Sequence, residues 1–375
     1  MSEKVLLKGN DAIAEAAIRA GCTSYYGYPI TPQNELIATM AKRMVELGRV
    51  FIQAESEIAA INMCYGSAAV GSRTMTSSSG PGLSLKQEGI SYLVADELPA
   101  VIVNMVRGGP GMGNISPSQS DYFQATRGGG HGDYKTIVLA PSSVQELTTI
   151  VPLAFDLADK YRNPVIILGD GMLGQMMEPV DFDELKRPAD YRKDYVLTGA
   201  AGRPARTIYS LIFDAKLQEE HNWKLHRKFQ LIEQNETRYE TFLTDDADMI
   251  VVAYGMGARI AKGAIKRLRQ EGMKVGMLRP VTLWPFPSKA LQELAATVED
   301  FFVFEMSAGQ MVEDVRLALG GKANVHFYGR PGGVIPMPIE LYRIVSRHYY
   351  QAHTAGRQPQ AAGYQAQGAG SGRQP

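Results

Sequence analysis

The stretch SYYGYPITPQNEL, residues 24–36, sets the pattern for the fold. A short run of aromatic and small residues leads into a turn in which Pro29 and Pro32 bracket Thr31, and a helical pattern follows. A strand that turns into a helix is the repeating unit of an α/β fold. The turn is unusual, because each proline fixes its own φ angle and biases the residue before it, Tyr28 or Thr31, toward extended geometry. We therefore expect the Thr31 side chain to stand at the carboxyl end of a strand.

The same alternation of short apolar runs and helical patterns continues on both sides of this stretch. It predicts strands at 23–27, 49–53, 72–76, 100–106, 135–139 and 164–168, with helices near 10–20, 32–46, 57–69, 83–95 and 142–160. Asn10 and Gly21 stand where an N-cap and a C′ glycine are expected for the first helix. The alternation resumes at 248–349. The pattern therefore favours two mainly parallel, doubly wound sheets.

Four segments are expected along the chain. Residues 1–190 form the first α/β domain, and the polar, charged stretch 191–246 is a connecting segment with a surface helix. Residues 247–350 form a second, smaller α/β domain. The tail, 351–375, is rich in Gln, Gly and Ala and holds too little apolar surface to fold, so we expect it to be disordered.

The composition excludes several classes of protein. Lys plus Arg equals Asp plus Glu at 39 each, so no global basic field draws in nucleic acid or an anionic membrane. No stretch approaches the roughly 18 to 20 apolar residues of a membrane span, and a cytoplasmic protein is the default expectation. The two cysteines, Cys22 and Cys64, are too few to hold an iron–sulfur cluster or a zinc finger alone, and no metal site is expected in this chain.

Four unusual loops follow predicted strands, where ligands bind in open parallel sheets. Arg107 directly follows the apolar strand PAVIVNMV, which suits recognition of a small carboxylate or, equally, a salt bridge at the rim. Glu57 opens a helix, as a functional carboxylate or as compensation of the helix dipole. The four loops are YPITP (28–32), QAESE (53–57), SSSGPG (77–82) and RGGPGMGNISPSQSD (107–121).

These loops resemble those of the α subunit of 2-oxoacid:ferredoxin (acceptor) oxidoreductases. The resemblance rests on YPITP, on AESE followed by a helix, on TSSSGPG, on the arginine that closes the fourth strand, and on SPSQSDYFQATRGGGHGD. VVAYGMG, LRPVTLWPFP and FFVFEMSAGQ resemble the transketolase-C-like domain of that family. The resemblance spans about residues 5 to 350. Within the family, the sequence is most similar to the branched-chain 3-methyl-2-oxobutanoate (2-ketoisovalerate) type.

The resemblance implies a pyrimidine-type domain of a thiamine diphosphate enzyme. The cofactor would be shared with a β subunit that holds the diphosphate, magnesium and an iron–sulfur cluster, with none bound covalently to this chain. Further ferredoxin-like γ and δ subunits, ferredoxin or another acceptor, and coenzyme A are the other implied partners. Gly169-Asp170-Gly171 copies the start of the magnesium–diphosphate motif, but no asparagine follows from 170 through 221, which agrees with that division of labour.

The resemblance also implies roles for individual residues. Glu57 would hydrogen-bond N1′ of the aminopyrimidine, and Thr31 and Arg107 would together hold the carboxylate and ketone oxygens of the substrate. Two further residues, Gln119 and Asp121, lie in a loop that could contact substrate. Four residues would lie against the cofactor: Pro29, Ser79, Gly80 and Gly82.

The expected reaction is oxidative decarboxylation of a 2-oxoacid to an acyl-CoA and CO₂, with electrons passed to iron–sulfur centres. 2-Oxoisovalerate is the favoured substrate, and 2-oxoglutarate or an aryl 2-oxoacid are alternatives that the sequence leaves open. Another alternative is a nicotinamide-dependent oxidoreductase that uses the glycine loop 255–261, although Ala261 replaces the third glycine of a dinucleotide fingerprint. A non-catalytic scaffold with the same fold is the third.

Overall fold

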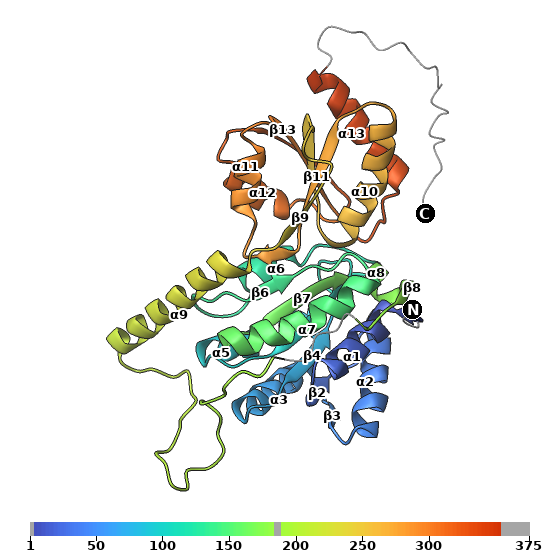
Figure 1. The fold of residues 1–375 in the computed structure, drawn as a ribbon. Coiled ribbons are helices and arrows are strands. Elements are labelled where there is room, and N and C mark those ends of the chain that lie inside the picture. The colour runs from blue at the N-terminus through green and yellow to red at the C-terminus, as the bar shows by residue number, and fades with distance from the viewer. Residues whose placement is uncertain (1–3, 184–188, 354–375) are drawn as a thin grey trace, which may run out of the picture.

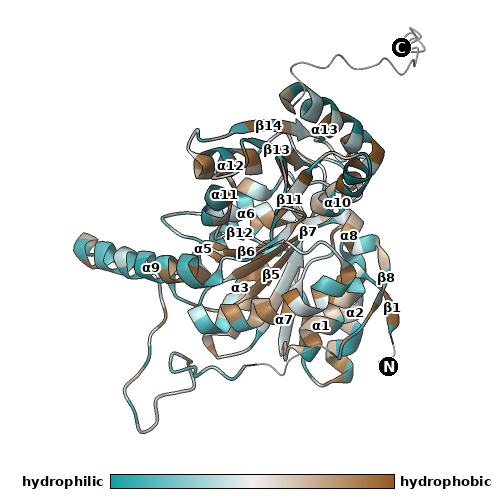
Figure 2. Cartoon of the chain, turned by 45° about the horizontal axis from the view of Figure 1, so that its top comes forward, coloured by the Kyte–Doolittle hydropathy of each residue, from teal (hydrophilic) through white to brown (hydrophobic). Residues whose placement is uncertain are grey.

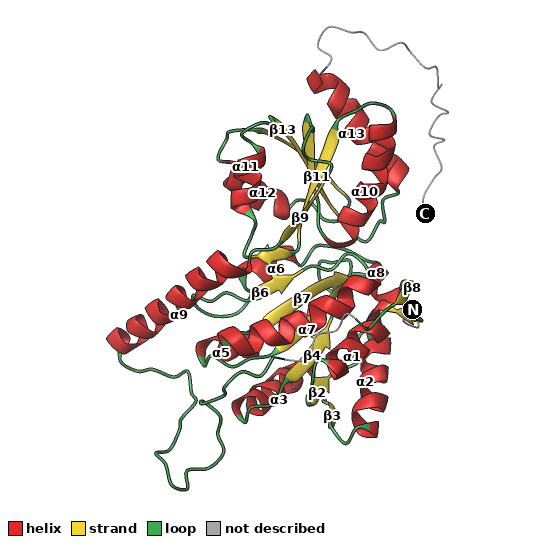
Figure 3. Cartoon of the chain, viewed as in Figure 1, coloured by secondary structure: helices red, strands yellow, loops and turns green. Residues whose placement is uncertain are grey.

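The computed structural model describes residues 4–183 and 189–353. Figure 1 shows a larger α/β lobe that carries the N-terminus, a smaller α/β lobe stacked on it, and the long helix α9 at one side. Each lobe contains a mainly parallel sheet flanked by helices, as the strand colours of Figure 3 make clear. The predicted fold class, two doubly wound α/β domains, is confirmed.

The sheet of the larger lobe has seven strands in the order β12-β6-β7-β5-β4-β2-β3. All neighbours are parallel except β12, which runs antiparallel to β6. The central strands β5 and β7 are buried along their whole length, as expected for parallel strands covered by helices on both faces. The strands are β2 (Ser24–Gly27), β3 (Val50–Gln53), β4 (Thr74–Ser78), β5 (Val101–Val106), β6 (Ile137–Leu139), β7 (Val165–Asp170) and β12 (Thr282–Trp284).

The helices of this lobe follow the predicted pattern with short additions. The helix predicted at 83–95 is two helices, α4 and α5, that meet at Lys86. The short helices α6 and α8 and the antiparallel ribbon β1–β8 were missed, because elements of four to six residues carry little periodicity. The bounds are β1 (Val5–Lys8), α1 (Gly9–Arg19), α2 (Asn34–Glu46), α3 (Glu57–Ala69), α4 (Pro81–Leu85), α5 (Gln87–Ala95), α6 (Tyr122–Arg127), α7 (Val144–Tyr161), α8 (Gly171–Gln175) and β8 (Met177–Val180).

The smaller lobe has a five-stranded sheet in the order β14-β13-β10-β11-β9, in which only β9 is antiparallel. Strand β13 is wholly buried and supplies three phenylalanines to the core. The elements are β9 (Tyr239–Phe242), β10 (Met249–Val252), α10 (Gly255–Gln270), β11 (Val275–Pro280), α11 (Ser288–Leu294), β13 (Asp300–Glu305), α12 (Met311–Leu319), β14 (Asn324–Gly329) and α13 (Pro338–His353).

Helix α9 (Ala215–Glu236) is the surface helix predicted in the connecting segment. It buries Leu225, Phe229 and Ile232, and most of its surface is hydrophilic in Figure 2, in contrast to the apolar strands β5 and β6. The Phe229 ring packs edge-on against Trp284, with centroids 6.0 Å apart. The helix ends at Glu236, and the chain continues into β9 at Tyr239.

Strand β12 of the larger lobe follows β11 of the smaller lobe along the chain. After β11 the chain leaves the second sheet, and β12 adds to the edge of the first, next to β6. The buried Arg279 guanidinium spans the junction: its Nη2 lies 2.7 Å from the Glu146 carboxylate of α7 and 2.8 Å from the Glu240 carboxylate of β9. We propose the domain division expected from the sequence with one change, the assignment of 282–284 to the first sheet.

The C-terminal helix of the second domain is longer than the sequence predicted. Helix α13 continues through residue 353, so the first three residues of the tail expected at 351–375 are helical, and the rest lie outside the described part of the chain. Within residues 4–183 and 189–353, no helix combines the length and apolar character needed to cross a membrane.

Candidate functional site

The four predicted loops lie at one edge of the first sheet. Strands β5, β4, β2 and β3 are consecutive neighbours and parallel, so their carboxyl ends meet along one rim. This rim brings together Thr31, Glu57, Gly82 and Arg107, which are up to 76 positions apart in the sequence. Local pattern predicted each loop, whereas the strand order places them side by side.

Glu57 is the first residue of α3 and is 6% exposed. Ser56 caps this helix, since its Oγ accepts a hydrogen bond from the Ala59 N–H at 3.1 Å. The Glu57 carboxylate packs against the first turn of α4. A methyl group on Gly82 would lie 2.4 Å from Glu57 Oε1 and 2.3 Å from Ser78 Oγ. Only glycine at this position therefore leaves room for the carboxylate as it stands.

Of the three serine side chains in the SSSGPG loop, one is hydrogen-bonded within the described structure and two are not. Ser77 Oγ lies 2.5 Å from Tyr25 OH and donates to Gln33 Oε1 at 2.5 Å. Ser78 Oγ and Ser79 Oγ are buried and have no partner among the described residues. Buried hydroxyls without a partner are costly and mark places where a ligand completes the hydrogen bonds.

Arg107 and Thr31 are in contact through the Thr31 backbone, and their joint hold on a substrate stays a prediction. Arg107 Nη1 donates to the Thr31 carbonyl oxygen and Nη2 to the Met112 carbonyl oxygen, both at 3.0 Å. The guanidinium carries five N–H donors, and its buried Nε has no partner in the described structure. The Arg107 side chain also passes 3.5 Å from where a methyl group on Gly80 would lie. The contact uses the backbone carbonyl of Thr31 and leaves other N–H groups of the Arg107 guanidinium available.

The turn that holds Thr31 is anchored from the other side by residues that the sequence analysis did not place there. The Pro32 carbonyl accepts hydrogen bonds from Asn10 Nδ2 at 2.9 Å and Gln175 Nε2 at 3.1 Å. Asn10 is therefore not an N-cap, because α1 begins at Gly9 and the buried Asn10 side chain is used across the chain. Pro29 is exposed on the open side of the turn.

Asp121 lies close enough to Arg107 for their charges to interact. Its Oδ2 accepts from Asn104 Nδ2 at 3.0 Å, and Asn104 Oδ1 is buried without a partner in the described part of the chain. Burial raises the pKa of Asp121 above its ordinary value, while the Asn104 bond and the Arg107 charge oppose that rise. Asp121 therefore remains a candidate for contact with substrate.

The buried Gln119 side chain is bonded within the chain, and its contact with substrate stays a prediction. Its side-chain amide donates to the Tyr254 carbonyl and accepts from the Met306 N–H, both at 2.9 Å. Both ends of the amide are thus used to join the loop to the second domain. The nicotinamide alternative is wrong in its geometry, because methyl groups on Gly255 and Gly257 would meet the Gln119 side chain at 3.3 and 3.1 Å. Gln119 occupies the space over the glycine turn where a dinucleotide phosphate would lie.

Asp170 of the Gly-Asp-Gly sequence has a structural role. Its Oδ1 accepts from the Met172 and Leu173 N–H groups at 2.9 and 3.1 Å and caps α8. Burial raises the pKa of Asp170 to about 6, while backbone N–H groups near the carboxylate act to lower it. The carboxylate thus fixes the start of α8.

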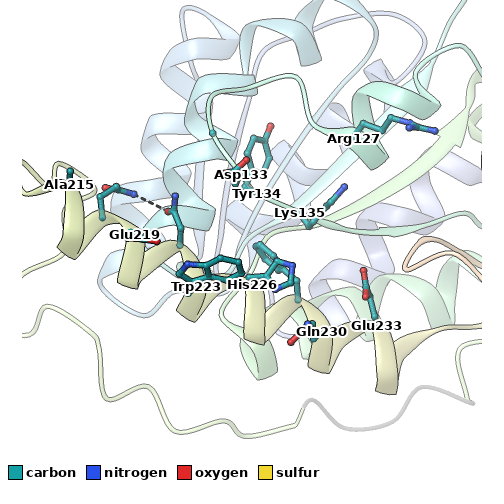
Figure 4. Close-up of a pocket in the computed structure, with 14 residues that line it drawn as sticks. Arg127, Asp133, Tyr134, Lys135, Ala215, Glu219, Trp223, His226, Gln230 and Glu233 are labelled. Carbon is teal, nitrogen blue, oxygen red and sulfur yellow. Dashed lines mark hydrogen bonds between the residues drawn. The ribbon is translucent and has the colours of Figure 1, made fainter.

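A cavity of about 710 Å³ lies elsewhere, between α9 and the loop at residues 127–135. Figure 4 shows Tyr134 and Lys135 on one wall and Trp223 and His226 of α9 on the other. Its lining mixes acidic, basic and aromatic side chains and includes none of the predicted site residues. The rim of strand ends is therefore the candidate site.

Residues 15–242 match the family described as pyruvate flavodoxin/ferredoxin oxidoreductase, thiamine diphosphate-binding, and residues 247–341 match pyruvate:ferredoxin oxidoreductase core domain II. The chain belongs to this family, and the membership predicted from the sequence is confirmed.

Two named proteins are similar to this chain over most of its length. The ketoisovalerate oxidoreductase subunit VorB of Methanothermobacter marburgensis is 51% identical over 344 residues, which cover 91% of this chain and 96% of that protein. The 2-oxoglutarate synthase subunit KorA of Methanothermobacter thermautotrophicus is 36% identical, over 92% of this chain and 99% of that protein.

Solved structures agree in fold. The 2-oxoglutarate:ferredoxin oxidoreductase from Magnetococcus marinus, solved with 2-oxoglutarate, coenzyme A and succinyl-CoA bound, superposes with a TM-score of 0.82 at 27% identity. The match covers 93% of this chain and 66% of that one. A split-gene transketolase matches at 17% identity with a TM-score of 0.57, which shows shared fold alone.

Proposed function

We propose that this chain is the α subunit of a thiamine diphosphate-dependent 2-oxoacid:ferredoxin oxidoreductase. The reaction converts a 2-oxoacid and coenzyme A into an acyl-CoA and CO₂, with two electrons passed to iron–sulfur centres. The single observation that supports it most is the Glu57 carboxylate, which is buried at the rim and packed against Gly82. Ser78 Oγ, which lies against the same side of Gly82, is buried and has no partner in the described structure.

The residues at the rim fit the aminopyrimidine half of thiamine diphosphate. Gly82 lets the backbone of α4 approach the carboxylate, and Ser78 and Ser79 supply buried hydroxyls that a ligand can bond. When bound, the cofactor supplies the carbanion chemistry that breaks the bond between the ketone carbon and the carboxylate of the substrate. The exposed Pro29 would lie at the open side of the cofactor.

Glu57 would accept a hydrogen bond from N1′ of the aminopyrimidine and hold a proton at that atom. Its burial keeps water away from this bond, which strengthens it. Arg107 would bind the substrate carboxylate through N–H groups that the Thr31 and Met112 carbonyls leave free, beginning with the unpaired Nε. The Thr31 hydroxyl would orient the same end of the substrate. Its single close partner, Asn34 Nδ2 at 3.5 Å, is weakly bound.

In this proposal, partner subunits supply the diphosphate site and the electron carriers of the reaction. A β subunit would hold the diphosphate, magnesium and a proximal iron–sulfur cluster, and ferredoxin-like subunits would carry the electrons to ferredoxin or another acceptor. Asp170, the residue of this chain that copies a metal-binding motif, supports that division, because its carboxylate is committed to backbone N–H groups. We place the assembled complex in the cytoplasm.

2-Oxoisovalerate is the proposed substrate. Two relatives named for ketoisovalerate are 51% identical to this chain, whereas two named for 2-oxoglutarate are 36% identical. A panel of 2-oxoisovalerate, 2-oxoglutarate and phenylglyoxylate on the assembled enzyme tests this choice. A higher kcat/KM for 2-oxoglutarate than for 2-oxoisovalerate would contradict it.

The test of the reaction is reconstitution with the β subunit and measurement of 2-oxoacid-dependent reduction of a viologen dye. Glu57→Gln keeps the shape of the side chain but cannot exchange the proton, so we expect bound cofactor with turnover reduced about 10²- to 10⁴-fold. Glu55→Gln, in the same loop but exposed, is the matched control and should leave turnover unchanged. Normal turnover of Glu57→Gln would exclude Glu57 from this role.

A further inference from the structure

The junction between α4 and α5 contains a lysine with no exposed surface. Lys86 lies between the two helices, as the C-cap of α4 and the N-cap of α5, and its exposed fraction is 0%. Its Nζ donates to Thr76 Oγ1 of β4 at 3.1 Å and to the Glu57 carbonyl oxygen of α3 at 3.3 Å. A lysine is almost never fully buried without a paired charge, so its presence here calls for a function.

The titratable groups that interact with this ammonium are Glu57 and Cys64, both on α3, while β4 contributes the neutral Thr76 hydroxyl. Burial lowers the pKa of Lys86 to about 8, and the two α3 groups oppose that fall. Burial also raises the pKa of the Cys64 thiol to about 11, so it stays neutral near pH 7. The acidic side chain that remains to balance the ammonium is Glu57.

A glycine cluster fixes this junction from the outside. Gln87 Oε1 accepts from the Gly129 N–H at 3.1 Å and from Tyr134 OH at 3.3 Å. A methyl group on Gly130 would lie 2.4 Å from the Gln87 carbonyl oxygen, so only glycine permits this close approach. The RGGGHGD loop (127–133) thus packs against the turn in which Lys86 points into the interior and holds that turn in place.

We propose that Lys86 is a positioning residue: its buried ammonium group fixes the first turn of α3 through the Glu57 carbonyl oxygen and holds a positive charge close to the Glu57 side chain. The inference rests on the proposed function, in which Glu57 bonds the aminopyrimidine. A charge held beside a buried side chain acts on it strongly, because little solvent screens the interaction. Lys86 itself touches neither substrate nor cofactor in this proposal.

The test compares two replacements in the enzyme assembled with its β subunit. Lys86→Gln keeps a donor for Thr76 and the Glu57 carbonyl but removes the charge, and Lys86→Met removes both. Two quantities are measured against pH: kcat, and the dissociation constant of thiamine diphosphate by calorimetry without substrate. Lys228→Met is the matched control, since burial also lowers the pKa of Lys228 to about 8 but that lysine lies on α9 beside Glu97.

In both Lys86 variants we expect the acid limb of kcat to move up by about one pH unit. The weakening of cofactor binding on the acid side should move with it, while the control variant keeps the wild-type profiles. A Lys86→Gln profile equal to wild type would overturn the proposal, because it would show a hydrogen-bond role alone. If Lys86→Met does not fold, the Gln variant still decides. A wild-type complex that neither binds thiamine diphosphate nor reduces the dye would instead refute the proposed function.

Discussion

Gly82→Ala is the change that tests the site most directly. The added methyl group would lie 2.4 Å from Glu57 Oε1 and 2.3 Å from Ser78 Oγ, whereas ordinary contact begins at 3.4 Å. Both atoms end mobile side chains, so the conflict is relieved by moving the carboxylate about 1 Å, with the backbone left in place. A displacement of that size at a catalytic group costs roughly 10²-fold in rate.

The assay is kcat for 2-oxoacid-dependent dye reduction by the assembled enzyme, with the unfolding temperature measured in parallel. We expect kcat to fall about 10²-fold, or roughly 2.7 kcal/mol of transition-state stabilisation, with the fold retained. Gly66→Ala is the matched control, because Gly66 lies in α3 and a methyl group there meets no atom within 4 Å. That substitution should stabilise the helix by roughly 0.5–1 kcal/mol and leave kcat unchanged.

A double-mutant cycle shows whether the loss passes through Glu57. Gly82→Ala should cost nothing further in a Glu57→Gln background, since residues that act together are not additive. A stable Gly82→Ala enzyme with kcat within about twofold of wild type would refute the reasoning. So would a full, additive loss in the double variant, because the methyl group would then act on something other than Glu57.

Three further outcomes are expected. Arg107→Gln should raise KM for the 2-oxoacid roughly 10- to 150-fold, the equivalent of one charge-assisted bond of about 1.5–3 kcal/mol, while KM for coenzyme A stays the same; an unchanged 2-oxoacid KM would remove Arg107 from substrate binding. The pKa of Lys86 is about 8 in the fold against 10.5 for a free side chain, so its destabilising effect is full below pH 8 and fades as pH rises toward 10.5. The free energy of unfolding of Lys86→Met minus that of wild type should therefore fall by roughly 2–3 kcal/mol between pH 7 and pH 10, and a difference that does not vary with pH would contradict this. Arg279→Met should destabilise the chain by roughly 2–4 kcal/mol in denaturant unfolding, because the largely buried Glu146 carboxylate loses this positive charge and, among the described residues, keeps only its hydrogen bonds from Ser142; a change below about 0.5 kcal/mol would show that the domain junction does not depend on it.

The sequence by itself determined the local units of this protein. Period-2 and period-3.6 patterns located the long helices and the buried strands, since each pattern depends on side chains a few positions apart. The prolines around Thr31, the acid that opens α3 and the glycines before α4 marked loops whose backbone geometry is set locally. The same local residues carried the resemblance to the family.

Only the tertiary structure decided which groups meet. The sheet order puts the Thr31 carbonyl on the Arg107 guanidinium, across 76 positions, and no local pattern encodes that pairing. Gln119 reads as a loop residue in sequence, yet it fills the glycine turn of another domain. Lys86 reads as a solvent-exposed helix residue, and its burial against Glu57 arises because α3, β4 and the α4–α5 break pack together. Long-range contacts of this kind depend on how whole elements pack, which is why they emerge from the fold and not from the neighbouring residues.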